Sequence, residues 1–336
     1  TEFVKKDEAL FRRHFHCETY LFSQKPKEIL ASFFWQFIFL LKNSHKTDAF
    51  VSFFAGYSSF LPSIFGKILG IPHIVILGGT DCAALPEIGY GNFRKQPLKW
   101  ITKTTIELAS HLVPVHASLI QFDYTYFPVR YPKQGFKAFC PTANAPVTVV
   151  STAYDGQKFY CAEAKIPKSF ITVAQLDPIT FLRKGIDLIL EVAPRFPECS
   201  FTIVGAHPEF LNRKIPDNVK LLPRIPNNEL RELLGSQQFY LQLSLMEGLP
   251  NALCEAMLCE CIPIGSDVAG IPDGIGESGF VLNKRDVNSL ELLMKEALGS
   301  GSGTLGQLAR KRILEAYPME VRNGLVEIIK NEMIKK

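Results

Sequence analysis

Short apolar runs alternate with stretches of helical periodicity along most of the chain. The apolar runs predict strands at Ala49–Phe54, His73–Leu77, Leu112–Val115, Val147–Ser151, Ile171–Leu176, Phe201–Val204, Val219–Leu222, Phe239–Leu243, Ile262–Gly265 and Gly279–Leu282. Most of these runs are apolar throughout, as expected for strands buried on both faces of a parallel sheet. The intervening helices include Asp187–Ala193, Asn228–Leu234, Asn251–Glu260 and Ser289–Leu298. The alternation predicts βαβ units and doubly wound α/β sheets.

The chain has 336 residues, which exceeds an ordinary single core and indicates two domains. We predict a first domain over residues 1–155, a second over residues 156–318 and a C-terminal helical segment over residues 319–336. The boundary lies in the polar stretch 155–169, between two series of strands. The glycine and serine residues of 299–306 predict a flexible turn before the final helices.

The most apolar run of the chain is Leu30–Leu41, which reads LASFFWQFIFLL. It is shorter than the roughly 20 residues that a membrane-spanning helix needs. Lys25 and Lys27 precede the run and Lys42 follows it. Two interpretations stay open: a buried helix of the first domain, which we favour, and a helix that faces one membrane monolayer with basic flanks.

Composition narrows the class of protein. The chain is 47% apolar and 21% charged, as is typical of a globular protein. A net charge of +4 permits anionic substrates or an acidic membrane surface, but it is far from a nucleic-acid-binding signature. Eight scattered cysteines without paired metal-ligand spacing indicate buried thiols in a reducing, cytoplasmic compartment.

Two glutamates flank a predicted strand-to-helix turn. Glu247 follows the run ending near Leu245, and Glu255 lies eight residues later in the second turn of the next helix. Pro250 suits the first helical position, and the free N–H groups at that helix end favour an anion such as a diphosphate. One carboxylate can then face a reacting group while the other binds a diol. The alternative is that both glutamates are solvated charges without function.

The segment Glu247–Met257 (EGLPNALCEAM) resembles the E-x7-E motif of family 4 retaining glycosyltransferases of the GT-B fold. Ile262–Asp273 resembles the strand and glycine loop that follow it, and the likeness is strong from Phe170 to Leu282. The resemblance implies two Rossmann-like domains facing a cleft. It also implies a retaining hexosyltransferase that moves a sugar from a nucleotide sugar to an acceptor, without a metal or other cofactor.

The resemblance also assigns roles in the second domain. It gives catalytic roles to Glu247, near the donor sugar, and to Lys184, against the donor diphosphate. It assigns donor binding to Glu255 (the ribose hydroxyls), Gly248, Leu249, Pro250, Asn251, Arg224 and Ile225. We also expect Arg183 on the donor side, where it or Arg213 would compensate for an arginine of the family that this chain lacks, although the motif itself supports neither. Gln175 stands where the family usually has an arginine. The chain has no Asp-x-Asp pair of the kind that holds a metal in the other large glycosyltransferase fold.

The first domain matches the family less well. Gly78 and Gly79 stand where the family often has a histidine, and they lead to Asp81. Asp81 orients the acceptor or takes its proton, and the alternative is that it caps a turn or the next helix. His116 also follows a strand, where it faces the acceptor or is structural. The first strand and glycine loop of the family are missing before Phe3.

The expected partners are a UDP- or GDP-linked sugar and a glycan or lipid-linked acceptor, as in polysaccharide biosynthesis. The expected location is the cytoplasm, with peripheral contact to the inner face of the membrane and no binding of nucleic acid. Two other functions stay open. One is a sugar-nucleotide epimerase of the same fold. The other is a non-catalytic nucleotide-sugar-binding subunit, which Gln175 and the missing histidine favour.

Overall fold

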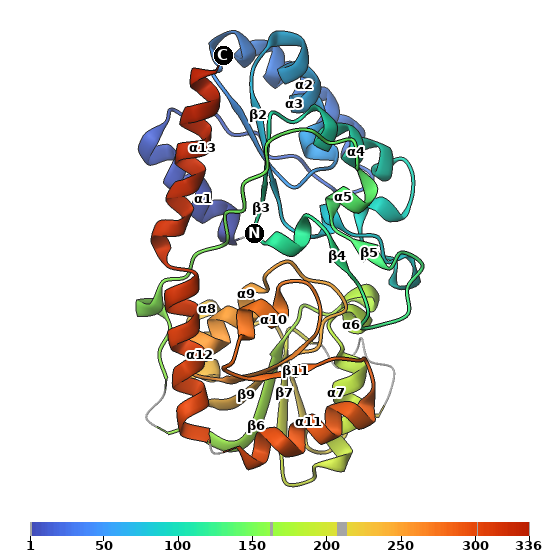
Figure 1. Cartoon of the computed structure of the whole chain (residues 1–336), viewed down its shortest axis with the longest axis vertical. Helices are drawn as coiled ribbons and strands as arrows, with labels where there is room; N and C mark the ends of the chain where they lie inside the picture. Colours follow the sequence, from blue (N-terminus) through green and yellow to red (C-terminus); the bar gives the residue numbers. More distant parts are fainter. Residues whose placement is uncertain (1, 162–163, 207–213, 301, 336) are drawn as a thin grey trace. The chain divides into compact units, whose positions relative to one another are not determined.

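The computed structural model describes residues 2–161, 164–206, 214–300 and 302–335, and the chain divides into two compact units (Figure 1). Unit 1 consists of Thr1–Asp123, Lys133–Thr152 and Glu320–Lys336. Unit 2 consists of Tyr124–Pro132 and Ala153–Met319. The short segment Tyr124–Pro132 is therefore part of unit 2, although the chain on both sides of it is part of unit 1.

Unit 1 is built on a parallel sheet in the order β1 (Phe50–Phe53), β2 (His73–Leu77) and β3 (His111–Pro114). Every residue of the central strand β2 is buried, as its continuous apolar run predicts. The helices of unit 1 are α1 (Glu2–His14), α2 (Ile29–Asn43), α3 (Tyr57–Leu69), α4 (Leu98–Leu108), α5 (Phe136–Phe139) and α13 (Asn323–Ile334). A short hairpin of β4 (Phe122–Asp123) and β5 (Lys133–Gln134) also belongs to this unit.

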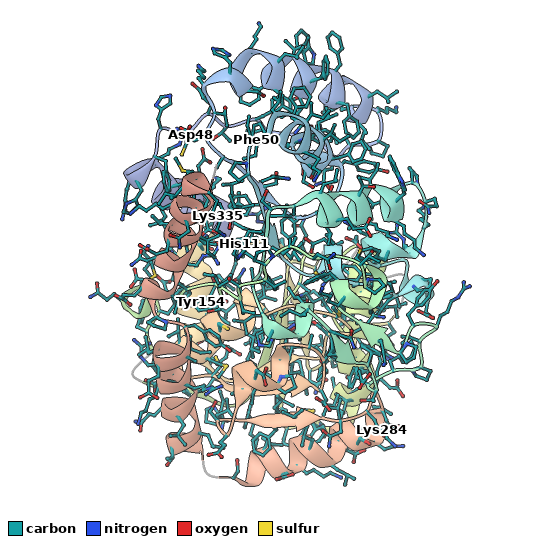
Figure 2. The ribbon with its side chains drawn as sticks, turned by 45° about the horizontal axis from the view of Figure 1, so that its top comes forward. Asp48, Phe50, His111, Tyr154, Lys284 and Lys335 are labelled. Carbon is teal, nitrogen blue, oxygen red and sulfur yellow. The ribbon has the colours of Figure 1, made fainter. Side chains whose placement is uncertain are left out.

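Buried polar contacts fix the last helix within unit 1. The Arg322 guanidinium pairs with Asp7 of α1 and also donates to the carbonyl oxygen of Val150 at 2.9 Å. Near the other end of α13, a Glu332 carboxylate oxygen lies 3.2 Å from Nδ1 of His111 in β3. His111 is labelled in Figure 2. Because these groups are buried, the contacts hold α13 against the sheet.

Unit 2 is built on a six-stranded parallel sheet in the order β11-β10-β9-β6-β7-β8. The strands are β6 (Ile166–Val173), β7 (Ser200–Val204), β8 (Val219–Leu222), β9 (Gln237–Gln242), β10 (Ile262–Ser266) and β11 (Phe280–Leu282). The helices are α6 (Pro178–Arg183), α7 (Ile186–Val192), α8 (Asn227–Ser236), α9 (Asn251–Leu258), α10 (Ile271–Ile275), α11 (Val287–Gly299) and α12 (Ser302–Ala316). From β6 the chain continues to β7 and β8 on one side of this strand. It then crosses to β9 on the opposite side of β6, so the strand order reverses between β6 and β9.

Three phenylalanine rings form the centre of this sheet. Phe170 of β6 stacks on Phe201 of β7 and on Phe239 of β9, with ring centroids 5.0 and 4.7 Å apart. All three side chains are fully buried. They fix the register of β6 against both neighbours, and this register positions the loops at the carboxyl ends of β6 and β9.

Every predicted strand except one overlaps an observed strand. The exception is 147–151, which runs beside β3 and bonds to it through the N–H groups of Thr148 and Val150, but forms only one bridge, between Leu112 and Val147. Pro146 lacks an N–H group to extend this ladder.

The predicted turn at 299–306 is also wrong in part, because α12 begins at Ser302. Gly306 lies inside this helix, where a Cβ atom would come within 2.5 Å of the Glu260 carbonyl oxygen. The glycine therefore serves close packing of α12 and not a turn.

The preference for a buried Leu30–Leu41 helix is wrong as well. The helix forms as α2, but Leu30 is 84% exposed and Trp35 is 60% exposed. Among the described residues, no helix combines the length and the apolar character that crossing a bilayer requires.

Candidate functional site

The reversal of strand order between β6 and β9 marks the place where ligands bind in open α/β sheets. Two loops leave the carboxyl ends of these strands. The basic loop, residues 174–185, follows β6, and residues 243–250 lead from β9 to α9. Most of the predicted donor-side residues lie in these two loops.

The conformation of the basic loop follows from its own residues. The Asp177 carboxylate accepts hydrogen bonds from the N–H groups of Ile179 and Thr180 at 2.9 and 2.8 Å, and so caps α6. Gly185 has a φ of 70°, and a Cβ atom at this position would come within 2.4 Å of the Leu243 carbonyl oxygen. A glycine therefore lets the loop approach the end of β9.

A backbone bond completes this contact between the two loops. The N–H of Leu245 donates to the carbonyl oxygen of Arg183 at 2.7 Å. Arg183 and Lys184 are thereby held beside the residues that follow β9.

Arg183, Lys184 and Glu247 form one ionic cluster. Glu247 Oε1 lies 2.7 Å from Lys184 Nζ and 2.8 Å from Arg183 Nη1. The Ser244 hydroxyl donates to the same oxygen at 3.3 Å. Each of the three charged side chains is between 15 and 17% exposed, so solvent screens the cluster only in part.

Opposing effects set the ionisation of Glu247. Burial raises its pKa, but Lys184, then Arg183, and the hydrogen bonds from Lys184 and Ser244 lower it further than burial raises it. The net result is a pKa below the ordinary value of 4.5. Glu247 is thus a carboxylate at neutral pH and holds both cations at the end of β9.

The start of α9 lies immediately after this cluster. Pro250 is the N-cap residue in an extended conformation, and the helix begins at Asn251, so the prediction that Pro250 is the first helical residue is off by one position. The Tyr154 hydroxyl donates to Asn251 Oδ1 at 2.8 Å, and the Gly270 N–H donates to the Gly248 carbonyl oxygen at 2.9 Å. The first N–H groups of a helix have no acceptor within it, so this end favours an anion.

Glu255 lies in the second turn of α9, as predicted, and is half-buried. It is four residues after Asn251 and therefore shares the same face of the helix. Leu249 is buried in the loop before the helix.

The residues expected near the nucleotide base lie apart from the cluster. Arg224 and Ile225 lie in the loop between β8 and α8, where Arg224 is exposed and Ile225 is half-buried. No hydrogen bond or ion pair of the described residues joins Arg224 to the cluster around Glu247. Gln175, at the start of the basic loop, is exposed, and Arg213 lies outside the described residues.

Asp81 of unit 1 has a structural role. Its carboxylate is fully buried and accepts hydrogen bonds from the N–H groups of Ala55, Gly78 and Gly79 at 2.9, 3.1 and 2.9 Å. Burial raises its pKa, and these backbone bonds lower it to a smaller extent. A general base must reach the proton that it takes. Both oxygens of Asp81 already accept backbone N–H groups inside the unit, which favours the turn-capping alternative over the role of Asp81 as the acceptor's base.

Two of the other three residues predicted on the acceptor side, Gly78 and His116, are also explained by local packing. A Cβ atom at Gly78 would come within 2.1 Å of the Phe54 ring, so this turn has no room for the histidine of the family. His116 is buried, and its Nδ1 accepts from the Ser118 N–H at 3.2 Å, which caps the turn Ala117–Leu119. Within the described residues, no group of three or more histidine, cysteine, aspartate or glutamate side chains is arranged to hold a metal ion.

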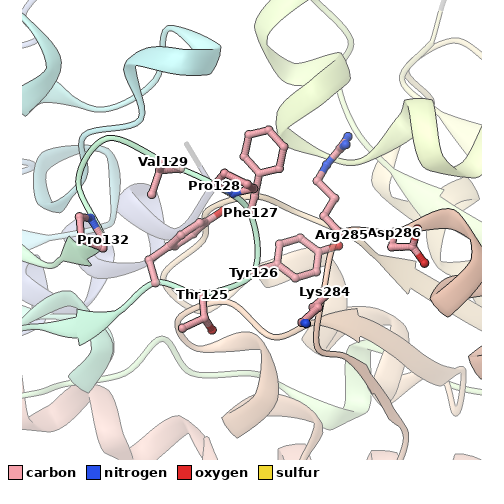
Figure 3. Close-up of a pocket in the computed structure, with 10 residues that line it drawn as sticks. Thr125, Tyr126, Phe127, Pro128, Val129, Pro132, Lys284, Arg285 and Asp286 are labelled. Atoms are coloured by element: carbon pink, nitrogen blue, oxygen red, sulfur yellow. The ribbon is translucent and has the colours of Figure 1, made fainter.

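Sequence reasoning missed a pocket in unit 2 of about 500 Å³ (Figure 3). It is lined by residues of the segment Tyr124–Pro132 and by Lys284, Arg285 and Asp286. The Tyr124 hydroxyl donates to the Leu245 carbonyl oxygen at 2.8 Å, so this segment contacts the end of β9 beside the ionic cluster. The sequence of this segment, YTYFPVRYP, is rich in aromatic residues and proline, and this composition was the sequence feature that could have indicated a pocket.

Residues 167–299 match the family described as glycosyl transferases group 1. The phosphatidylinositol N-acetylglucosaminyltransferase gpi3 subunit of Schizosaccharomyces pombe is 28% identical over 138 residues, which are 38% of this chain and 30% of the relative. The matched part of the chain thus spans less than a third of that relative's length.

Two solved structures share the fold. Sucrose-phosphate synthase from Thermosynechococcus elongatus has a TM-score of 0.69 at 16% identity, covering 95% of this chain and 82% of the other. Anabaena HepE in complex with UDP-glucose has a TM-score of 0.68 at 14% identity, covering 96% of this chain and 88% of the other. Residues 167–299 therefore resemble the glycosyl transferases group 1 family, and the chain has the GT-B fold.

Proposed function

We propose that this protein transfers a sugar from a nucleotide sugar to an acceptor with retention of anomeric configuration. The observation that carries the proposal is the cluster of Arg183, Lys184 and Glu247 at the point where the strand order of unit 2 reverses, directly before the start of α9. Two cations and a helix N-terminus at one location suit a diphosphate.

The cluster suggests how the bond to the leaving diphosphate is broken. Negative charge on the diphosphate grows as the glycosidic bond breaks, and fixed cations stabilise that charge more in the transition state than in the ground state. Lys184 and Arg183 supply the cations, and Glu247 keeps them in place before the donor binds. Glu255, on the α9 face that begins at Asn251, then accepts hydrogen bonds from the ribose hydroxyls.

The proposed retention rests on the resemblance to retaining glycosyltransferases, and the state of Glu247 bears on how retention would be achieved. Its contacting oxygen lies within 2.8 Å of two cationic nitrogens, which lowers its nucleophilicity toward the sugar. The acceptor then attacks on the face from which the diphosphate leaves, assisted by that leaving group. Because Lys184 and Arg183 already supply the positive charge, we propose that the reaction needs no metal, and that excess EDTA leaves its rate unchanged.

The proposed donor is a UDP- or GDP-linked sugar, and the proposed acceptor is a glycan or a lipid-linked glycan. HepE, which shares the fold, was solved with UDP-glucose, and the Schizosaccharomyces pombe relative is named as part of a phosphatidylinositol N-acetylglucosaminyltransferase. All eight cysteines are free, which supports a reducing compartment such as the cytoplasm.

The test is a thermal-shift screen against UDP- and GDP-linked sugars, followed by a transfer assay with the best donor. A ligand at about a hundred times its Kd should stabilise the protein by about 2.7 kcal/mol. Proton NMR of the product then reports the anomeric configuration. Transfer that needs added acceptor and gives the donor's anomer supports the proposal. Isomerisation of the donor without acceptor indicates an epimerase, and tight binding without turnover indicates a non-catalytic binding protein.

A further inference from the structure

Helix α2 of unit 1 exposes large apolar side chains, unlike an ordinary surface helix. Its buried positions include the polar residues Ser32 and Gln36. Its exposed positions hold large apolar side chains with these exposed fractions: Leu30 84%, Phe34 59%, Trp35 60%, Phe37 42% and Leu41 54%. We call these five residues the α2 outer face.

The outer face is one continuous stripe. Leu30, Phe34, Phe37 and Leu41 follow the spacing i, i+4, i+7 and i+11, which places them along one side of a helix. Trp35 flanks the stripe, and its ring lies 5.3 Å from that of Phe34. Figure 2 shows side chains projecting from α2 on the side away from the rest of unit 1.

Hydrogen bonds on the inner side fix this orientation. Gln36 Nε2 donates to the Ser58 carbonyl oxygen at 2.7 Å. The Ser32 hydroxyl accepts from the Ser23 N–H at 3.2 Å, and the Ser32 carbonyl oxygen accepts from the Tyr20 hydroxyl at 2.8 Å. Rotating α2 to bury the apolar stripe would break these bonds, so the outer face is a stable feature of the fold.

The apolar surface continues onto the neighbouring helices. Ile68 and Leu69, at the end of α3, are 74 and 50% exposed, and Trp100 of α4 is 55% exposed. Ring contacts join α2 to α3 through Phe37 and Phe65, with centroids 5.6 Å apart. A monomeric protein seldom leaves an apolar area of this extent in water.

Exposed lysines lie before α2, in its last turn, after it and on α3. Residues 25–69 contain five lysines, which are Lys25, Lys27, Lys42, Lys46 and Lys67, and all five are exposed. The same stretch has only two acidic residues, and one of these, Glu28, is paired with Lys25 at 3.3 Å. The partner of this surface should therefore be apolar and anionic.

We propose that the α2 outer face binds the surface of an anionic phospholipid membrane. The helix would lie in the plane of the interface, with the aromatic and aliphatic side chains below the headgroups and the lysine ammonium groups among the lipid phosphates. Lysine is depleted in protein–protein interfaces, so the composition favours a lipid surface over a protein partner. The proposal goes beyond the proposed function and does not depend on which sugar or acceptor the protein uses.

The experiment is cosedimentation of the whole chain with vesicles of phosphatidylcholine alone and of phosphatidylcholine mixed with phosphatidylserine. We expect binding to the mixed vesicles that weakens as salt is raised. A Phe34→Ser/Trp35→Ser variant should bind about tenfold more weakly or worse, since two large side chains lose their burial. Each of Lys25→Gln and Lys42→Gln should weaken binding by about fivefold. The matched control is Leu292→Ser, since Leu292 is 68% exposed on α11 of unit 2, and it should bind like wild type.

Fluorescence locates the contact. Trp35 and Trp100 are the only tryptophans, so a Trp100→Phe variant reports on Trp35 alone. Its emission should shift to the blue with mixed vesicles and be quenched by brominated lipid. Equal sedimentation of wild type and the Phe34→Ser/Trp35→Ser variant, or an unchanged Trp35 spectrum, would overturn the proposal. A wild-type dimer that this variant converts to monomer, without vesicle binding, would assign the face to a second copy and also overturn it. Retained donor-induced thermal shift in the variant shows that the fold is intact.

Discussion

Glu247 of unit 2 and Asp81 of unit 1 are both carboxylates in loops that follow parallel strands, yet their surroundings differ. Glu247 lies between the side chains of Lys184 and Arg183 and is 16% exposed. Asp81 is fully buried and binds three backbone N–H groups. We propose that the carboxylate with side-chain cations belongs to an anion-binding site, whereas the one with backbone donors holds a turn together. The groups that bind a carboxylate, more than its position after a strand, therefore distinguish a functional carboxylate from a structural one.

The two carboxylates should also respond to pH in opposite directions. The pKa of Glu247 is lowered on folding, so its stabilising contribution is complete above the unfolded pKa and is lost as pH falls through the folded value. The pKa of Asp81 is raised by burial, so stability falls as pH rises from its unfolded to its folded pKa. The three backbone hydrogen bonds that its oxygens accept persist above that range.

The largest effect should come from removing the structural carboxylate. Asp81→Ala leaves the buried N–H groups of Ala55, Gly78 and Gly79 without their acceptor, and it should lower the free energy of unfolding by about 4 kcal/mol. Urea unfolding measures this loss. The control is Asp123→Ala, at an exposed position of the same unit, which should change stability by less than about 0.5 kcal/mol. A stable Asp81→Ala protein that has lost only its activity would reverse the assignment.

The next largest effect should be on catalysis. Lys184→Ala removes a cation from the place proposed for the diphosphate, and it should lower turnover by about two to three orders of magnitude. Initial rates at saturating donor test this, with Lys295→Ala on the exposed part of α11 as the matched control. Unchanged turnover in the Lys184 variant would remove the lysine from the mechanism.

Glu255→Gln should act on donor binding more than on turnover. Loss of a charged acceptor for the ribose hydroxyls should weaken donor affinity by roughly 1.5–3 kcal/mol, or about ten- to a hundredfold in Kd. Isothermal titration with the donor gives the affinity, and a deoxyribose version of the nucleotide supplies the control. If wild type and variant discriminate equally between ribose and deoxyribose, Glu255 does not contact the sugar hydroxyls.

The smallest effect is the pH dependence of the Glu247 cluster. Glu247→Gln removes the ion pairs with Lys184 and Arg183, and it should destabilise the protein by about 1–2 kcal/mol at neutral pH. The difference between variant and wild type should be constant above pH 4.5 and shrink as pH falls below it, because wild-type Glu247 becomes protonated there. Denaturant unfolding at several pH values measures it, and a difference that grows on acidification would contradict the ionic account.

These contrasts also show how much of the fold and of the candidate site could be predicted from the sequence. The buried strands of both sheets and the loop position of Glu247 follow from apolar runs and local turn chemistry, so they could be predicted. The orientation of α2 could not, since it depends on a hydrogen bond that α2 donates to Ser58 and on bonds that it accepts from Ser23 and Tyr20, all of which lie outside the helix. The role of Asp81 was left open for a similar reason, because the sequence of a strand followed by a carboxylate is the same whether that carboxylate binds backbone N–H groups or a substrate. The approach of Tyr124 to Leu245 spans 121 residues and had no local signal.

The account rests on a diphosphate that binds beside Lys184 at the start of α9. The most direct measurement is isothermal titration of UDP, GDP, UMP and GMP into wild type and Lys184→Met. We predict that one nucleoside diphosphate binds wild type at least about tenfold more tightly than its monophosphate, as one or more charge-assisted contacts to the second phosphate require. In Lys184→Met this preference should largely disappear while the monophosphate affinity stays the same. Equal affinity of wild type for diphosphate and monophosphate, or an undiminished preference in Lys184→Met, would contradict the account.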